Sequence, residues 1–188
     1  MTSKSANPLH TRVCDLLEID IPVVQTGMGW VATPSLVAGA CNAGVFGFLA
    51  AAGLPLDEVE ASIRETKELT DRPFGVNFLM DAPGAAEIVE MILRYEVRAA
   101  GYNRAPSADL IQRLKKEGVL CIPTCGAPRH VQKAEKLGAD MVIVQGGEGG
   151  GHTGSIPTSL QISACADAVE IPVLAAGGFK DGRGLVAA

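Results

Sequence analysis

The chain has 188 residues, of which 47% are hydrophobic and 20% are charged, a composition that predicts a globular protein with one core and excludes a disordered one. Its formal net charge is −5, and lysine and arginine are scattered along the chain, so we expect neither nucleic acid nor an anionic membrane as a partner. The longest apolar stretch, residues 43–54, contains three glycines and is too short to cross a bilayer. Because no apolar signal core stands near the start, we expect a cytoplasmic protein that binds a small molecule or another protein.

The five cysteines are odd in number and show no CxxC spacing, which indicates neither a disulfide framework nor a zinc site. A free cysteine behaves as a small apolar residue. We therefore expect most of the cysteines to lie in the core: Cys14, Cys41, Cys121, Cys125 and Cys165.

Seven short runs rich in valine, isoleucine and phenylalanine predict β-strands, and stretches of helical period separate them. Helices are expected between the strands, including residues 56–69 and residues 108–117. Ser107 is placed to cap the second of these helices and Gly118 to end it. The strands are expected over residues 21–25, 44–49, 74–79, 97–102, 119–123, 141–145 and 173–176.

Polar residues or glycines end or follow almost every predicted strand. An open doubly wound sheet and a (β/α)8 TIM barrel both fit alternating strands and helices, but only the barrel assembles its site from the carboxyl ends of many strands. The first strand runs into QTGMGW, which lacks the third glycine of a GxGxxG dinucleotide motif, so we predict an α/β TIM barrel. The residues at the strand ends are Gln25, Gly27, Asn77, Asn103, Thr124, Gln145, Gly177 and Gly178.

No linker or change of composition divides the sequence, so we expect a single domain over residues 1–188. A TIM barrel typically needs about 250 residues. We therefore expect a barrel truncated after strand seven, lacking the eighth strand and the C-terminal region. The open edges of strands one and seven would expose unpaired backbone groups, and we expect self-association through them.

The segment QGGEGGGHTG begins at the last residue of the sixth predicted strand and holds six glycines in the nine positions after Gln145. Glycine has no Cβ, so its backbone can take positive φ and approach a bound ring or phosphate closely. One imidazole, His152, stands in this segment. The segment predicts a ligand site, and the alternative interpretation is a solvated surface loop.

A second glycine turn, Gly177 and Gly178, closes the seventh strand, and Asp181 is placed to cap a short helix after it. Barrels often hold a cofactor phosphate after strands seven and eight, on exposed backbone amides. We interpret Gly178 as a phosphate contact, and the alternative is a plain turn between strand and helix.

Five segments resemble the nitronate monooxygenase family, also called 2-nitropropane dioxygenases, in order and spacing. The resemblance runs from residue 19 to the last residue, and QGGEGGGHTG is its most specific part. It implies an FMN-binding TIM barrel that oxidises alkyl nitronates with molecular oxygen, giving nitrite and a carbonyl compound. The segments are PVVQTGMGWVATPSLVAGACNAGVFGFL, RPFGVNFLM, GVLCIPT, GADMVIVQGGEGGGHTG and IPVLAAGGFKDGRG.

The resemblance also implies contacts with the flavin ring, carried over position by position. Gln25, Gly27 and Met28 would lie against the isoalloxazine. Asn77 and Gln145 would hydrogen-bond the flavin.

The same resemblance places Gly150, Gly177 and Gly178 near the ribityl phosphate and makes His152 the catalytic base. Gly149 stands where relatives commonly have alanine, which is expected to loosen the loop. Removing a proton from carbon beside a nitro group needs a base that titrates near neutrality, and imidazole is the side chain with that property.

Other residues have weaker assignments. We expect His10 and His130 to be solvated, and Glu148 to be an exposed loop acid unless it serves as a second carboxylate of the site. Trp30 and Tyr102 stand near strand ends, where they would either wall a substrate pocket or pack in the core.

Two further functions stay open. An FMN-dependent enoyl-acyl-carrier-protein reductase or quinone reductase that uses NAD(P)H would share nearly every site residue. A non-catalytic truncated remnant would fit the short chain.

Overall fold

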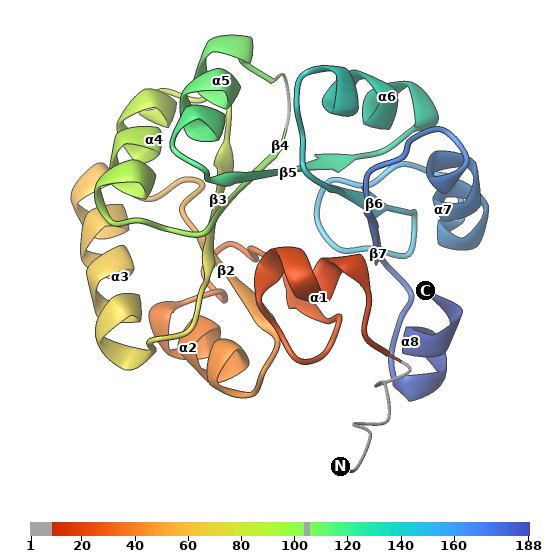
Figure 1. The fold of residues 1–188 in the computed structure, drawn as a ribbon, viewed down its shortest axis with the longest axis horizontal. Helices are drawn as coiled ribbons and strands as arrows, with labels where there is room; N and C mark the ends of the chain where they lie inside the picture. The colour runs from red at the N-terminus through yellow and green to blue at the C-terminus, as the bar shows by residue number, and fades with distance from the viewer. Residues whose placement is uncertain (1–8, 104–105) are drawn as a thin grey trace, which may run out of the picture.

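A computed structural model describes residues 9–103 and 106–188 of the chain. Seven parallel strands lie in the order β1 to β7, so each strand pairs with the next one along the sequence. The sheet curls, and the helices that connect the strands cover its outer side (Figure 1). The strands are β1 (Val24–Gln25), β2 (Phe46–Ala50), β3 (Gly75–Leu79), β4 (Ala99–Asn103), β5 (Leu120–Cys125), β6 (Val142–Gln145) and β7 (Val173–Ala176).

Eight helices are seen in the described residues. They are α1 (Arg12–Leu17), α2 (Pro34–Asn42), α3 (Leu56–Leu69), α4 (Ala85–Arg94), α5 (Ala108–Lys116), α6 (Pro128–Lys136), α7 (Thr158–Ala166) and α8 (Gly182–Ala187). A helix follows each of the seven strands, and α1 precedes the first. The architecture is a (β/α) barrel wall of seven strands, which confirms the predicted TIM-barrel class.

All seven predicted strands are present, and α3 has the predicted bounds. The prediction for the first strand was too long, because only Val24 and Gln25 join the sheet. The chain turns tightly just before them, where the N–H of Val23 donates to the carbonyl of Ile21 across Pro22 at 2.7 Å. A proline has no N–H to give to a ladder, so residues before Val23 stay outside it.

The ends of α5 follow the local signals. The hydroxyl of Ser107 accepts a hydrogen bond from the N–H of Leu110 at 3.4 Å, which caps the first turn. Gly118 follows the last turn with φ of +76°, a backbone conformation that side chains other than glycine rarely adopt. Both predictions for this helix are confirmed.

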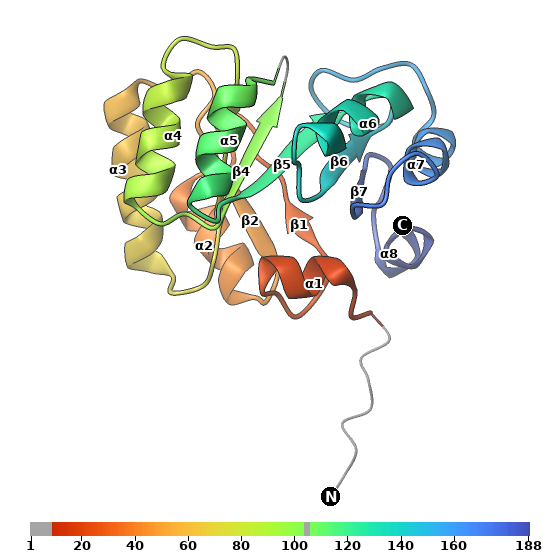
Figure 2. The same ribbon diagram turned by 45° about the horizontal axis from the view of Figure 1, so that its top comes forward.

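One core fills the inside of the curled sheet. Phe46 and Phe48 of β2 meet edge to face there, with ring centroids 5.1 Å apart. Glycines on the neighbouring strands make room for them, since a Cβ at Gly75 would lie 2.3 Å from the Phe48 ring and one at Gly101 would lie 2.9 Å from it. Helix α1 closes the amino-terminal end of this core with side chains such as Leu17 (Figure 2).

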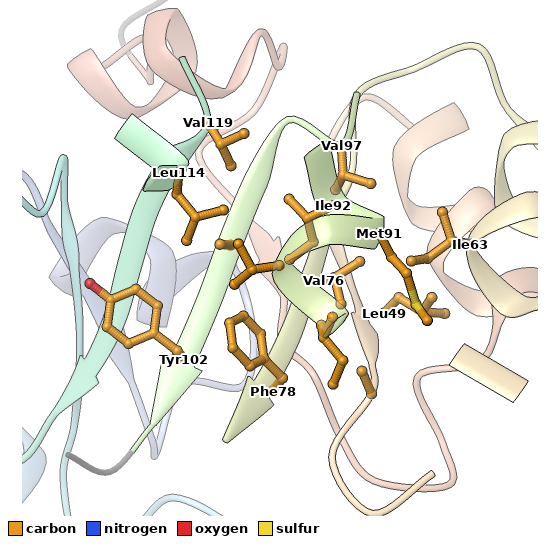
Figure 3. Close-up of a cluster of buried hydrophobic side chains, with 14 of the residues drawn as sticks. Leu49, Ile63, Val76, Phe78, Met91, Ile92, Val97, Tyr102, Leu114 and Val119 are labelled. Atoms are coloured by element: carbon orange, nitrogen blue, oxygen red, sulfur yellow. The ribbon is translucent and has the colours of Figure 1, made fainter. Parts of the chain in front are cut away.

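A second core lies between strands β2 to β5 and the helices outside them (Figure 3). Leu49, Val76 and Phe78 face α3 and α4 from the strands. Tyr102 is 1% exposed and packs beside Phe78 at a centroid distance of 6.4 Å. Tyr102 is therefore a packing residue of the helix side of the sheet, not a wall of the barrel mouth.

All five cysteines are buried, which confirms their expected place in the core. A smaller third core joins β6 to α6 and α7, and Cys125 and Cys165 belong to it. Burial raises the pKa of the Cys125 thiol to about 12, so this thiol stays protonated at neutral pH.

The sheet is open between its first and last strands. Over the described ranges, β1 pairs with β2 and β7 pairs with β6, with no pairing between β1 and β7. Apolar side chains on both sides of this gap are exposed, among them Ile21, Val23 and Phe179.

Within the described chain, none of the helices has the length and apolar character needed to cross a membrane.

Candidate active site

Polar residues stand at the carboxyl ends of β3 and β6, at the same end of the barrel. Asn77 follows Gly75 by two positions on β3, and Gln145 follows Ile143 by two positions on β6. Because side chains alternate along a strand and positions 75 and 143 face the inner core, Asn77 and Gln145 face inward as well. They stand at the carboxyl ends of their strands, where TIM barrels place their sites.

The loop after β1 lies directly on Asn77. A Cβ at Gly27 would lie 2.5 Å from the Cβ of Asn77, so this position needs glycine. Asn77 is only 8% exposed, and its amide nitrogen lies 3.0 Å from the place of a Cβ at Gly101. Further along the same loop, Met28 is 39% exposed and Trp30 is 92% exposed with φ of +59°, so Trp30 does not pack in the core.

The Gln25 side chain points away from the inside of the barrel. Its Oε1 lies 3.2 Å from the place of a Cβ at Gly47, where Val37 of α2 also packs, which puts the amide on the helix side of the sheet. Its Nε2 donates to the carbonyls of Thr26 and Phe48. The structure therefore does not group the Gln25 side chain with Asn77 and Gln145, and the sequence pattern could not show this orientation.

The glycine loop after β6 is folded over the end of its own strand. Gln145 Nε2 donates to the carbonyl of Gly150 at 2.5 Å. A Cβ at Gly149 would lie 2.5 Å from the same Nε2, so glycine at 149 lets the amide reach across the loop. Gln161 of α7, which is 2% exposed, donates to the backbone carbonyl of Gln145 at 3.0 Å and holds the strand end from the other side. No motif in the sequence indicated Gln161.

The turn after β7 packs against this loop. Gly177 and Gly178 have φ of +103° and +79°. A Cβ at Gly177 would lie 2.7 Å from the backbone nitrogen of Gly149, so the two glycine segments touch. The helix after this turn begins as predicted, because the Asp181 carboxylate accepts from the N–H of Arg183 at 3.0 Å.

The two segments offer free backbone donors to a ligand. In the described chain, the N–H groups of Gly150, Gly177 and Gly178 have no hydrogen-bond partner, and a Cβ at Gly150 would meet no atom within 4 Å. Unpaired backbone N–H groups suit a phosphate or another anion. The residues present therefore fit a phosphorylated flavin.

His152 lies on the exposed part of the glycine loop. Among the described residues none hydrogen-bonds its imidazole, so the ring is open to a ligand and to solvent. His10 pairs with Asp15 at 2.8 Å, and His130 is exposed at the start of α6, so both are solvated as expected. Clusters of three or more metal-ligating side chains are absent from the described residues.

Glu148 is an exposed loop acid, as expected, and it also has hydrogen-bond partners. Its Oε2 accepts from the N–H of Thr158 at 2.7 Å and from the Thr158 hydroxyl at 2.5 Å. These hydrogen bonds hold the pKa of the Glu148 carboxyl below its ordinary value. The proline before Thr158 marks a helix start, but no pattern in the sequence indicated that Thr158 binds Glu148.

A parallel α/β barrel wall with unpaired glycine amides at the carboxyl ends of β6 and β7 is typical of barrel enzymes that hold a phosphorylated ligand. Comparison with known sequences names the family. The chain belongs to the nitronate monooxygenase family, whose sequence model matches residues 10–101 and 85–188. This family consists of flavin oxidoreductases.

Two relatives show the range of the family. The chain is 53% identical, over 96% of its length, to the (3aS,4S,5R,7aS)-5-hydroxy-7a-methyl-1-oxo-octahydro-1H-indene-4-carboxyl-CoA dehydrogenase of Rhodococcus jostii, and it covers 51% of that protein. It is 31% identical, over 95% of its length, to a probable nitronate monooxygenase of Staphylococcus saprophyticus, and it covers 64% of that protein. The chain thus spans between half and two thirds of the length of these relatives.

Solved structures agree on the fold. FabK from Thermotoga maritima superposes with a TM-score of 0.91 at 36% identity, over 95% of this chain and 57% of that one. The nitroalkane oxidase of Streptomyces ansochromogenes superposes with a TM-score of 0.77 at 30% identity, over 86% of this chain and 59% of that one.

Proposed function

We propose that this chain carries the FMN site and the catalytic base of an oxidoreductase that acts on a carbon acid, with alkyl nitronates and nitroalkanes as substrates and molecular oxygen as oxidant. The observation that carries the proposal is the contact between the two glycine segments, with His152 on one of them and unpaired amides on both. Family membership supports the flavin, and the relatives named nitronate monooxygenase support the substrate class.

In this proposal the cofactor site is built mainly from backbone. The amides of Gly150, Gly177 and Gly178 would bind the FMN phosphate, and the inward amides of Asn77 and Gln145 would hydrogen-bond the flavin ring. The backbone of Gly27 and the exposed Met28 would lie against the ring, whereas Gln25 would contribute only through its strand, because its side chain is turned toward α2.

His152 supplies the proton chemistry. Its imidazole takes the proton from the carbon beside the nitro group of a neutral nitroalkane, and a nitronate, already deprotonated, does not need this step. A bound FMN would supply the redox chemistry between substrate and oxygen. An exposed imidazole without a competing hydrogen bond is free to reach a substrate proton.

A second candidate is dehydrogenation of an acyl-CoA thioester. The observation that favours it is the 53% identity to the indene-carboxyl-CoA dehydrogenase, against 31% for the nitronate monooxygenase relative. The carbon next to a thioester carbonyl is also a carbon acid, so the same base and flavin would serve. An NAD(P)H-dependent enoyl or quinone reductase stays the third possibility.

Three reactions of the FMN-loaded chain separate these functions. Nitrite released from a nitronate in the presence of oxygen, without NADH, supports the proposal. Anaerobic bleaching of the flavin by an acyl-CoA, or by NADH, with no nitrite from nitronates, moves the assignment to the dehydrogenase or to the reductase. A chain that shows no flavin absorption after loading overturns the proposal altogether.

The base is tested with His152→Ala. Losing a positioned base typically slows proton transfer by about 10²- to 10⁴-fold, so turnover of a neutral nitroalkane should fall by that factor while FMN binding and turnover of the preformed nitronate persist. His130→Ala, at the exposed start of α6, is the matched control. Equal loss with both substrates would remove His152 from the proton step.

A further inference from the structure

We infer that Glu148 and Thr158 form a latch that holds the glycine loop after β6 against the turn after β7, so that they are positioning residues of the cofactor site. The latch rests on the proposed function only in its link to FMN, since its contacts belong to the chain itself. Its members come from the middle of the glycine loop and from the first residue of α7.

The Glu148 carboxylate of the latch caps the first turn of α7. The residue before the helix is Pro157, which has no side-chain oxygen to cap the first turn. Glu148 supplies that oxygen from ten residues earlier, since its Oε2 accepts from both the N–H and the hydroxyl of Thr158. A carboxylate at a helix N-terminus also meets the positive end of the helix dipole. Thr158 is 4% exposed, so its side chain is fixed by packing as well.

The same pair touches both glycine segments. A Cβ at Gly146 would lie 2.2 Å from the Thr158 hydroxyl oxygen, and one at Gly177 would lie 3.0 Å from it. A Cβ at Gly178 would lie 3.4 Å from the Cβ of Glu148. Thr158 therefore lies beside both the loop that carries His152 and the turn after β7. Glu148, within that loop, lies beside the turn as well.

This geometry keeps Glu148 out of the proton chemistry. One of its oxygens already accepts two hydrogen bonds, and these hold the pKa of the carboxyl low, so the group stays ionised near neutral pH. An ionised carboxylate occupied by helix donors stabilises a loop conformation and is a poor proton acceptor. The role of Glu148 is to set the shape of the site.

Two variants break the latch from opposite sides. Glu148→Gln removes the charge, and Thr158→Val removes the hydroxyl while keeping the branched shape. Loss of a helix cap typically corresponds to about a fivefold change in an equilibrium, so the hydrogen-bonded backbone amides of Gly146, Gly147 and Gly149 should exchange hydrogen for deuterium about fivefold faster in the FMN-free chain. The FMN dissociation constant, from flavin fluorescence, should rise by a similar factor. Thr158→Ser, which keeps the hydroxyl, should restore both values.

Glu135→Gln is the matched control. Glu135 of α6 also accepts from two backbone N–H groups, those of Glu170 and Ile171 at 2.9 and 3.2 Å, but these donors precede β7, whereas the glycine turn follows it. The Glu135→Gln variant should leave amide exchange in the glycine segments and FMN binding unchanged. The latch is wrong if the Glu148 and Thr158 variants exchange like the control. Faster exchange in a chain that binds no FMN keeps the latch and overturns only the proposed function.

Discussion

The two sides of the barrel wall are built differently. Strand β2 is buried at all five positions and β3 at its first four, with helices packed outside them. Strand β7 is only partly buried along its whole length, and α8 has no buried residue. The first side is closed by side chains, whereas the second ends in glycine segments in which the amides of Gly150, Gly177 and Gly178 are unpaired among the described residues. Buried packing is therefore concentrated on the first side, whereas the proposed phosphate site lies on the second.

The largest contrast is expected from removing a side chain on each side. Phe48→Ala deletes a fully buried ring from the inner core, and such a change typically costs about 3–5 kcal/mol of unfolding free energy. Val186→Ala on α8 removes a side chain that is 79% exposed, and the expected change is within about 0.5 kcal/mol. Urea unfolding followed by circular dichroism measures both. Comparable losses for the two variants would contradict the division of the wall.

A smaller contrast is expected from adding a methyl group. In Gly75→Ala the new Cβ would lie 2.3 Å from the Phe48 ring, and overpacking of this kind typically costs about 1–3 kcal/mol. Gly182→Ala at the start of α8 meets no atom within 4 Å and should be neutral or slightly stabilising. The double variant Gly75→Ala with Phe48→Leu is a further check, because a smaller side chain at 48 should recover part of the loss.

The smallest effect on the unfolding free energy is expected from a fall in pH that protonates Glu60. On the closed side, Glu60 of α3 accepts from the Tyr95 hydroxyl at 2.6 Å and from Arg94 at 3.0 Å, and these contacts lower the pKa of its carboxyl. A lowered folded pKa means stability that is present above the unfolded pKa and is lost as pH falls through the folded pKa. The difference in unfolding free energy between the wild type and Glu60→Gln should therefore be full at pH 7 and vanish in acid. A difference that grows toward low pH would contradict this sign.

The same acid titration sharpens the comparison of the two sides. The pKa of Glu148 is also lowered, mainly by its hydrogen bonds to Thr158. Because Glu148 holds a loop rather than two packed helices, its protonation should appear as reduced protection from amide exchange at Gly146, Gly147 and Gly149, after correction for the intrinsic exchange rate at each pH. Protonation of Glu60 should appear in global unfolding.

Much of the fold could be predicted because its signals are local. Apolar runs marked all seven strands, and the cap at Ser107 and the glycine at 118 marked the ends of α5. Asn77 and Gln145 were found because polar residues at the ends of parallel strands gather at one edge of a barrel. The glycine loop was found from its composition alone.

The sequence by itself determined the order of strands and helices, the barrel class and the glycine segments, since these depend on the spacing of apolar residues and on backbone preferences of single residues. Only the tertiary structure decided that Gln25 turns to α2, that Tyr102 packs beside Phe78, and that Glu148 binds Thr158. These outcomes depend on which strand face meets the helices and on contacts between residues distant in sequence. Spacing within one segment carries no information about such contacts, because sheet curvature and loop packing create them.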